Sequence, residues 1–248
     1  MLKYEINTHL DDPNTTIKHR DIILGKPFLK KIYVEWYSNF IEFVKTRPNG
    51  KFLEIGSGGG FLKDLAPQVT TSDIMPLPSC DMQLSAEEIP FENETLDGIF
   101  MINVLHHIPN PEKFFAEAER TLKKGGKIIM VEPVNTLLSR FIYKNFHHEP
   151  FNPEGGWTID STGPLSGANG ALPWIFMKRD KEKFAARFPY LKIENIKPHT
   201  AFRYTVSGGV SRKLLVPAFT FGLWKTIESI PLMNAICGMF GTYTVVKN

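Results

Sequence analysis

Cysteine is scarce in this chain. Its 248 residues include only Cys80 and Cys237, which lie far apart and form no C-x-x-C pair. This spacing argues against a thiolate zinc site and against a disulfide framework. The fold must therefore depend on an ordinary apolar core, and a chain of this length can bury one as a single domain.

Long apolar runs are also missing. Residues 214–224 and 229–246 carry no charged side chain, but prolines and glycines interrupt both segments. Because a membrane-spanning helix needs about 20 unbroken apolar residues, we expect none. The first residues have neither the basic start nor the apolar centre of a secretory signal, so we expect a cytoplasmic protein. No RNA-binding module is recognisable and the basic residues are dispersed, so we expect no nucleic-acid partner.

Charge is distributed unevenly along the chain. From Phe176 onward there are 12 Lys/Arg and 4 Asp/Glu residues, whereas residues 1–175 contain 17 and 22. A basic, aromatic-rich C-terminal third suits an anionic lipid surface or an acidic, lipid-linked substrate. A solvated basic face over an ordinary core explains the same pattern. Residues 199–238 are thus a candidate for peripheral membrane contact, and the association at the membrane surface would be additional to the cytoplasmic location.

The most informative feature that is present is a glycine-rich segment. Residues 52–60 read Phe-Leu-Glu-Ile-Gly-Ser-Gly-Gly-Gly, an apolar strand that runs into a flexible loop. Glycine permits positive φ angles and allows a ligand to approach the backbone closely. A following helix start offers free N–H groups. The segment predicts a pocket for a polar small molecule at the end of a parallel strand.

The order of the glycines separates two kinds of cofactor. A dinucleotide fingerprint, G-x-G-x-x-G, would need glycine at the position of Phe61. The chain has Gly56, Gly58 and Gly60 instead, with Glu54 two residues ahead. This E-x-G-x-G-x-G order resembles motif I of the class I S-adenosylmethionine (SAM) methyltransferases.

Further segments follow in the order that this family shows. They are Ser85–Phe91 (S-A-E-x-I-P-F), Leu96–Phe100 (L-D-x-I-F), Leu105–Ile108 (L-H-H-I) and Leu122–Lys127 (L-K-x-G-G-K). Together with the glycine loop they resemble the methyltransferase type 11 group, typified by the ubiquinone and menaquinone C-methyltransferases. The resemblance covers about residues 50–133. It implies a SAM-dependent methyltransferase, and it says little about the acceptor.

The resemblance and the alternation of strands and helices together predict an α/β fold. We expect a Rossmann-like, mostly parallel seven-stranded sheet with helices on both faces and an antiparallel last strand. Residues 1–50 would form an N-terminal helical cap, residues 51–198 the SAM-binding core with a long loop at 146–172, and residues 199–248 an insertion and the final strand.

Periodicity predicts several individual elements. Apolar residues at three- and four-residue spacing predict a helix over 27–44, which either packs on the sheet or covers the cofactor pocket as a lid. A second helical pattern begins at Pro111 and ends at the Lys123–Gly126 step, before a strand at 127–133. We also expect a helix at 180–188 and strands at 191–198 and 241–247.

The resemblance also implies roles for cofactor residues. Gly56, Ser57 and Gly58 would line the methionine and ribose portions of SAM, with Glu54 near its amino-acid end. Asp73, at the tip of the second strand, would hold the ribose hydroxyls, since a carboxylate can accept from both. The remaining contacts implied are Ile74 against the adenine, Ser85 and Ala86 at the adenine edge, and Asn103 beside the methionine. Ser85 stands where the family often has an acid.

Methyl transfer from a cationic sulfur requires in-line approach of the acceptor, so positioning and exclusion of water should dominate. A hydroxyl acceptor also needs a base. His107 and His148 are the candidate catalytic residues, with His106, His147 and Glu149 as neighbours that could act instead. We expect no metal ion in this reaction.

Three functions remain open from the sequence. The first is a methyltransferase acting on a small-molecule, sugar or lipid-linked acceptor. The second is a nucleotide-dependent oxidoreductase, which Phe61 and Glu54 disfavour. The third is a SAM-binding module without catalysis, since binding motifs report a cofactor and not turnover.

Overall fold

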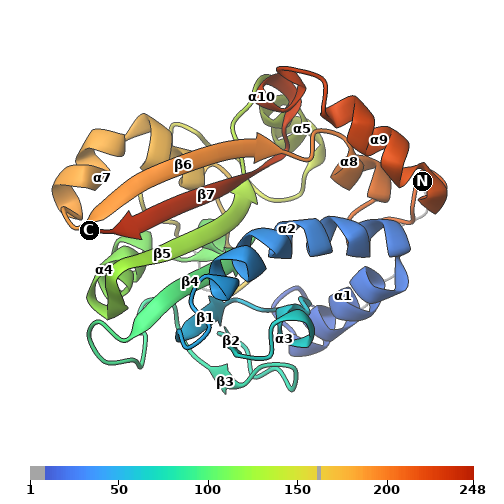
Figure 1. Ribbon diagram of the computed structural model, residues 1–248. Coiled ribbons are helices and arrows are strands. Elements are labelled where there is room, and N and C mark those ends of the chain that lie inside the picture. Colours follow the sequence, from blue (N-terminus) through green and yellow to red (C-terminus); the bar gives the residue numbers. More distant parts are fainter. Residues whose placement is uncertain (1–8, 161–162) are drawn as a thin grey trace.

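The computed structural model describes residues 9–160 and 163–248, and a seven-stranded sheet forms its centre (Figure 1). The strand order is β3-β2-β1-β4-β5-β7-β6. The strands are β1 Phe52–Ile55, β2 Val69–Asp73, β3 Met82–Gln83, β4 Leu96–Ile102, β5 Leu122–Pro133, β6 Leu191–His199 and β7 Phe240–Lys247. Pairing is parallel from β3 to β5, and β7 is antiparallel to both β5 and β6. The predicted mostly parallel sheet with an antiparallel last strand is confirmed.

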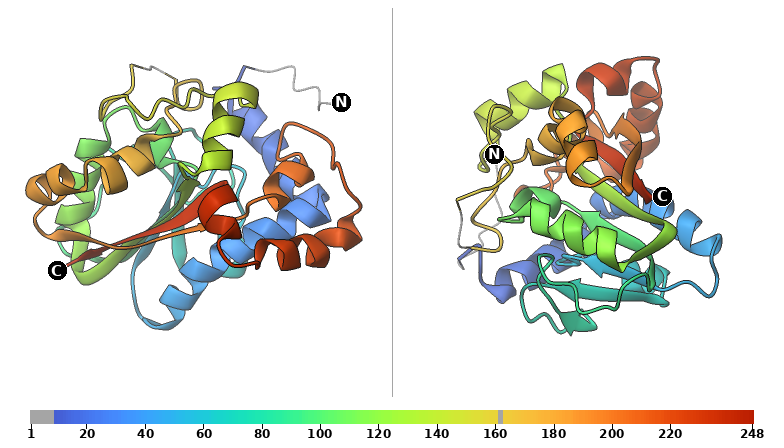
Figure 2. Two further views of the ribbon diagram at one scale, coloured as in Figure 1. Left: turned by 90° about the horizontal axis from the view of Figure 1, so that it is seen from above. Right: turned by 90° about the vertical axis from the view of Figure 1, so that its left-hand side faces the viewer.

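Helices lie on both faces of this sheet, with α2 on one side and α4 and α7 on the other (Figures 1 and 2). The α-helices are α1 Pro13–Gly25, α2 Pro27–Lys45, α3 Leu62–Leu65, α4 Pro111–Thr121, α5 Leu137–Phe146, α6 Leu172–Trp174, α7 Lys181–Arg187, α8 Arg203–Ser207, α9 Phe221–Glu228 and α10 Met233–Cys237. Shorter helical turns are η1 Leu105–His107, the π-helical η2 Ile175–Arg179, and η3 Ala218–Thr220.

Aromatic side chains join the layers. Phe40 of α2 stacks on Phe100 of β4, with ring centroids 4.8 Å apart and an interplanar angle of 5°. On the opposite face, Phe115 of α4 meets Phe184 of α7 edge-to-face at 4.9 Å. All four rings are fully buried. The predicted helix over 27–44 is therefore confirmed, and its apolar face packs on the sheet.

The prediction for the end of α4 is wrong. The helix stops at Thr121, and residues 122–126 already belong to β5. The strand accommodates them through a register shift, since Leu96 pairs with Leu122 but Gly98 pairs with Lys127. Lys123 and Asp97 form an ion pair of 2.6 Å across this irregularity. Helical periodicity could not reveal a bulged strand that is fixed by contacts with β4.

The C-terminal elements agree with their predictions. Helix α7 and strands β6 and β7 lie within one residue of the expected bounds. Residues 147–171 contain no helix or strand in the part of that segment that the structure describes. Residues 199–238 form α8, η3, α9 and α10 between β6 and β7. Among the described residues no helix is both long and apolar enough to cross a bilayer.

Candidate functional site

The glycine loop follows β1 and has the conformation that its sequence suggests. Gly56 and Gly58 have φ angles of +65° and +49°, which side chains other than glycine adopt rarely. A Cβ at Gly56 would overlap the side chain of Val104, which follows β4. The backbone N–H of Ser57 donates to the carbonyl of Ser72 at 2.8 Å. The loop is therefore fixed between the ends of three neighbouring strands.

Two buried carboxylates flank this loop. Glu54, at 2 % exposure, accepts a 2.6 Å hydrogen bond from the hydroxyl of Ser57. Burial raises the pKa of Glu54 to about 7, although the Ser57 hydrogen bond acts in the opposite direction. Asp73 accepts from the backbone N–H groups of Gly58 and Met75, each at 2.9 Å. Burial raises the pKa of Asp73 above its ordinary value against these hydrogen bonds.

The other predicted cofactor residues surround the same loop. Asn103 directly follows β4 with φ +56°, and its buried Oδ1 has no hydrogen-bond partner among the described residues. Ile74 follows Asp73 and is 47 % exposed, which leaves its side chain free to pack on a ligand. The backbone N–H of Leu84 donates to the carbonyl of Asp73, which places Ser85 and Ala86 beside the end of β2.

Helix α1 lies directly on the glycine loop, where the sequence had suggested α2 as a lid. A Cβ at Gly59 would lie 2.9 Å from the backbone nitrogen of Arg20. Arg20 also donates to the carbonyl of Gly60 and pairs with Asp64 at 3.0 Å. Thr16 is 4 % exposed, lies beside Gly58, and its Oγ1 has no hydrogen-bond partner in the described part of the chain.

A second set of ionisable groups gathers after β4 and β5. Glu132 near the end of β5 is fully buried and accepts from Nδ1 of His106 at 2.6 Å. Its other oxygen accepts from the backbone N–H groups of Val104 and Leu105, each at 2.7 Å. Burial alone would lower the pKa of His106, but Glu132, and then Glu149, raise it to about 10.

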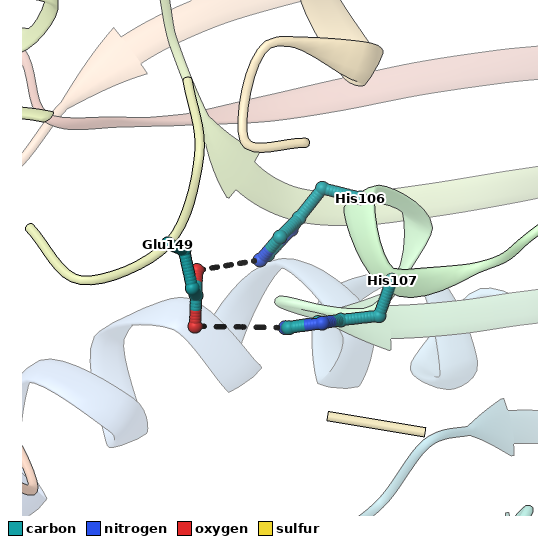
Figure 3. Close-up of side chains that lie close together, drawn as sticks. All are labelled: His106, His107 and Glu149. Atoms are coloured by element: carbon teal, nitrogen blue, oxygen red, sulfur yellow. Dashed lines mark ion pairs between the residues drawn. The ribbon is translucent and has the colours of Figure 1, made fainter. Parts of the chain in front are cut away.

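The loop after α5 brings Glu149 opposite two imidazoles (Figure 3). Its carboxylate oxygens lie 3.5 Å from Nε2 of His106 and 3.8 Å from Nε2 of His107. Burial and the neighbouring His106 lower the pKa of His107 to about 4. His147 and His148 also lie within 3.8 Å of Glu149. Both predicted catalytic histidines, His107 and His148, thus meet at one carboxylate.

Helix α1 also links the two sets. Its residue His19 adjoins Gly59, and burial together with His148 lowers the pKa of His19. The glycine loop and the histidine turn η1 follow the carboxyl ends of the adjacent parallel strands β1 and β4. Ligands of open α/β sheets bind at this edge.

Several residues at this edge were not predicted. Thr16 and Arg20 come from a helix with no clear apolar stripe, so periodicity gave no signal for it. Cys80 lies near Ser57 and Asp73, and burial raises the pKa of its thiol to about 11. Glu132 did carry a signal, because it is a lone acid in the otherwise apolar strand segment 128–134.

Comparison with known proteins finds a family match that includes the glycine loop. Residues 53–130 match the family model described as a methyltransferase domain. The chain is 36 % identical to a sterol 4-C-methyltransferase of Caenorhabditis elegans over 45 % of its own length and 41 % of that protein. It is 23 % identical to a demethylmenaquinone methyltransferase of Symbiobacterium thermophilum over 58 % of its own length and 56 % of that protein.

A solved structure of a SAM-dependent methyltransferase from Methanosarcina mazei covers 80 % of the chain, and the chain covers 92 % of it, with a TM-score of 0.47 at 16 % identity. The chain spans about half the length of the curated relatives it matches. The family match includes both the glycine loop and its flanking acids, since all of them lie within residues 53–130. Residues 53–130 thus match a methyltransferase domain, and the SAM cofactor belongs to the proposal that follows.

Proposed function

We propose that this protein transfers a methyl group from SAM to a small-molecule or lipid-linked acceptor. The observation that carries the proposal is the pair of buried carboxylates, Glu54 and Asp73, on either side of the glycine loop. Buried acids are costly unless they have partners. Among the described residues, Glu54 accepts one hydrogen bond from a side chain, that of Ser57, and a bound ammonium group would supply a second partner.

The residues around the loop fit the cofactor. Glu54 would face the ammonium of the methionine portion, and Asp73 the ribose hydroxyls. The loop of Gly56, Ser57 and Gly58 would pass close beneath the ligand, because the two glycines carry no side chain of their own. Asn103 Oδ1 and Thr16 Oγ1 are buried polar atoms that lack partners in the described structure, and a polar ligand would supply them.

The adenine end has its own candidates. Ile74 would pack on one face of the ring, since its side chain is exposed beside Asp73. Ser85 and Ala86 would lie at the edge of the ring, next to the end of β2. SAM supplies a methyl group on a cationic sulfur. The chain would hold the donor and acceptor in line and exclude water with α1.

The acceptor would enter beside the histidines. The low pKa of His107 makes it a weak base at neutral pH. His148, with a side chain 57 % exposed at 3.6 Å from Glu149, is the better-placed base of the two.

A lipid-linked acceptor is supported by the surface around α5, α9 and α10, in which α10 contacts both other helices. Large apolar side chains are exposed there, namely Leu137, Phe141, Phe146, Phe219, Leu223, Ile230, Leu232 and Ile236. Phe146 directly precedes the His147–Glu149 segment. A membrane surface at this patch would present an acceptor next to the proposed transfer site. Peripheral membrane contact through residues 199–238 is therefore part of the proposal.

The test is methyl transfer from SAM labelled at its methyl group. The purified protein is incubated with lipid and aqueous fractions of a cell extract, and labelled products are separated and identified. We expect a labelled product in one fraction. Binding of S-adenosylhomocysteine without any labelled product would instead favour the non-catalytic SAM-binding module. Thermal stabilisation by NAD and not by S-adenosylhomocysteine would favour the nucleotide-dependent oxidoreductase.

A further inference from the structure

We infer that His106, His107 and Glu149 form a binding site for a first-row divalent transition-metal ion (Figure 3). One ligand atom from each of these residues lies within 4.8 Å of the others. Two imidazoles and one carboxylate are a common ligand set for Zn²⁺ and for non-haem Fe²⁺. The site goes beyond the proposed methyl transfer, because binding of the ion requires neither SAM nor an acceptor.

Both imidazoles are oriented by hydrogen-bond acceptors behind them. Nδ1 of His106 donates to the buried carboxylate of Glu132 at 2.6 Å. Nδ1 of His107 lies 2.9 Å from the carbonyl oxygen of Gly167, which can only accept. Both Nδ1 atoms are engaged in this way, and both rings turn Nε2 toward Glu149. Metal-binding histidines almost always have such an acceptor on the other ring nitrogen.

His107 and Glu149 face each other at a distance longer than a hydrogen bond. In the neutral ring the hydrogen sits on Nδ1, so Nε2 offers a lone pair. That lone pair faces Oε1 of Glu149 at 3.8 Å. Because these two atoms cannot hydrogen-bond to each other, a metal ion between them would give both a partner.

The distances from Glu149 to the two rings suit an ion after a small adjustment. Two ligands at about 2.1 Å from a tetrahedral ion lie about 3.4 Å apart. The distances from Glu149 to the two Nε2 atoms are 3.5 and 3.8 Å. Glu149 belongs to a loop without regular structure, so its carboxylate can move toward the rings. Its side chain is 22 % exposed, which leaves coordination positions open toward solvent.

Two further imidazoles lie close to the same carboxylate. Nδ1 of His147 lies 3.8 Å and Nε2 of His148 lies 3.6 Å from oxygens of Glu149. Four of the seven histidines of the chain therefore surround one acid. The remaining carboxylate in contact, Glu132, acts as a positioning residue, since its oxygens are engaged by His106 and two backbone N–H groups.

The experiment uses the full chain, stripped with EDTA and then titrated with Zn²⁺ by calorimetry and with Co²⁺ by visible absorption. We expect one ion per chain and the absorption bands of Co²⁺ bound to nitrogen and oxygen. Glu149→Gln should weaken binding more than about a hundredfold, and Glu132→Gln about 10- to 100-fold. His9→Gln is the matched control, because His9 also lies near an acid, Asp11 at 3.7 Å, but is 77 % exposed.

Two outcomes would contradict the metal site. Absence of Zn²⁺ and Co²⁺ binding by the wild type, or equal binding by wild type and Glu149→Gln, would overturn the site. A His106→Gln/His107→Gln double variant adds a second check, provided that circular dichroism shows it folded. Should that buried double variant fail to fold, Glu149→Gln alone decides, since Glu149 lies on a partly exposed loop.

Discussion

The backbone N–H of Gly58 donates a 2.9 Å hydrogen bond to Oδ2 of Asp73, so the loop after β1 is fastened to the end of β2. The same carboxylate accepts from Met75 through its other oxygen. Each oxygen keeps a lone pair, and the acid can therefore position the loop and bind a ribose diol at the same time. Asp73 thus connects the shape of the loop with the proposed ligand contact.

We expect Asp73→Ala to weaken the binding of S-adenosylhomocysteine by about 1.5–3 kcal/mol, the value of a hydrogen bond to a charged group. The variant removes the proposed ribose contact and also releases the N–H of Gly58. Isothermal titration calorimetry measures the affinity directly. Asp73→Asn should recover part of the loss, because the amide oxygen can still accept.

Asp81→Ala is the matched control for this change. Asp81 also accepts a backbone hydrogen bond at this edge, from Thr71 at 2.8 Å, and pairs with Lys63. In the described part of the chain, its hydrogen bonds and its ion pair go to Lys63 and Thr71 and not to the glycine loop. Equal affinity in Asp73→Ala and Asp81→Ala would mean that Asp73 does not bind the cofactor.

A second prediction concerns Thr16 on α1, whose hydroxyl is buried without a partner among the described residues and whose methyl group lies near Gly58. Thr16→Val removes an unsatisfied polar atom with little change of shape. We expect the free protein to gain about 1–3 kcal/mol of stability, since an unsatisfied buried group carries that cost. Affinity for S-adenosylhomocysteine should fall at the same time. A stability gain with unchanged affinity would show that α1 only covers the loop and does not contact the ligand.

Some elements of this fold can be predicted from local patterns in the sequence. The glycine loop, Asp73 and the apolar face of α2 follow from local patterns, because glycine torsion angles, strand ends and helical periodicity are properties of neighbouring residues. Asn103 could be placed at a strand end for the same reason. These parts of the fold were predictable from one sequence.

The rest depends on contacts between distant segments. Thr16 meets Gly58, Glu132 meets His106, and Glu149 meets His107, in each case through tertiary packing that no spacing rule encodes. Helix α1 is also amphipathic only weakly, since Thr15, Thr16 and Ile23 are its buried residues. The sequence named the histidines individually, but the geometry that opposes them to one acid required the folded chain.

A third prediction uses the pKa of Glu54, which burial raises from 4.5 to about 7. Between these two pH values the folded chain holds a proton that the unfolded chain has released. The stabilising contribution is fully present below about pH 4.5 and is lost as the pH rises through 7. We expect Glu54→Gln, which cannot ionise, to remove roughly 3 kcal/mol of this pH dependence. Urea unfolding at pH 5 and pH 8 of both proteins measures it.

The affinity for S-adenosylhomocysteine should show the opposite dependence on pH. An ammonium group prefers the ionised form of Glu54, so affinity for S-adenosylhomocysteine should decline as the pH falls below about 7 in the wild type. Glu54→Gln should bind weakly with a flatter profile. A wild-type profile that matches the variant between pH 5 and 8 would contradict the contact between Glu54 and the ammonium.

The last prediction concerns the exposed apolar surface near α9 and α10. Phe219 of η3 is 88 % exposed, so its ring is available to an acyl layer. Burying a phenylalanine side chain contributes about 1.5–3 kcal/mol, which corresponds to a change of about ten- to a hundredfold in partition. We therefore expect Phe219→Ser to reduce flotation with anionic vesicles by at least about tenfold. Tyr190→Ser is the control, since Tyr190 is an exposed aromatic residue between α7 and β6.

The salt concentration separates the electrostatic from the apolar contribution to vesicle binding. Basic side chains near the patch would act through the surface potential, and 0.5 M NaCl shortens the screening length to about half its physiological value. The salt-sensitive part should be lost in the wild type and in Phe219→Ser alike, while the apolar part survives only in the wild type. If wild type and Phe219→Ser float equally at both salt concentrations, residues 199–238 do not contact the membrane through this face, and an acceptor delivered from the lipid surface must reach the histidines by another side.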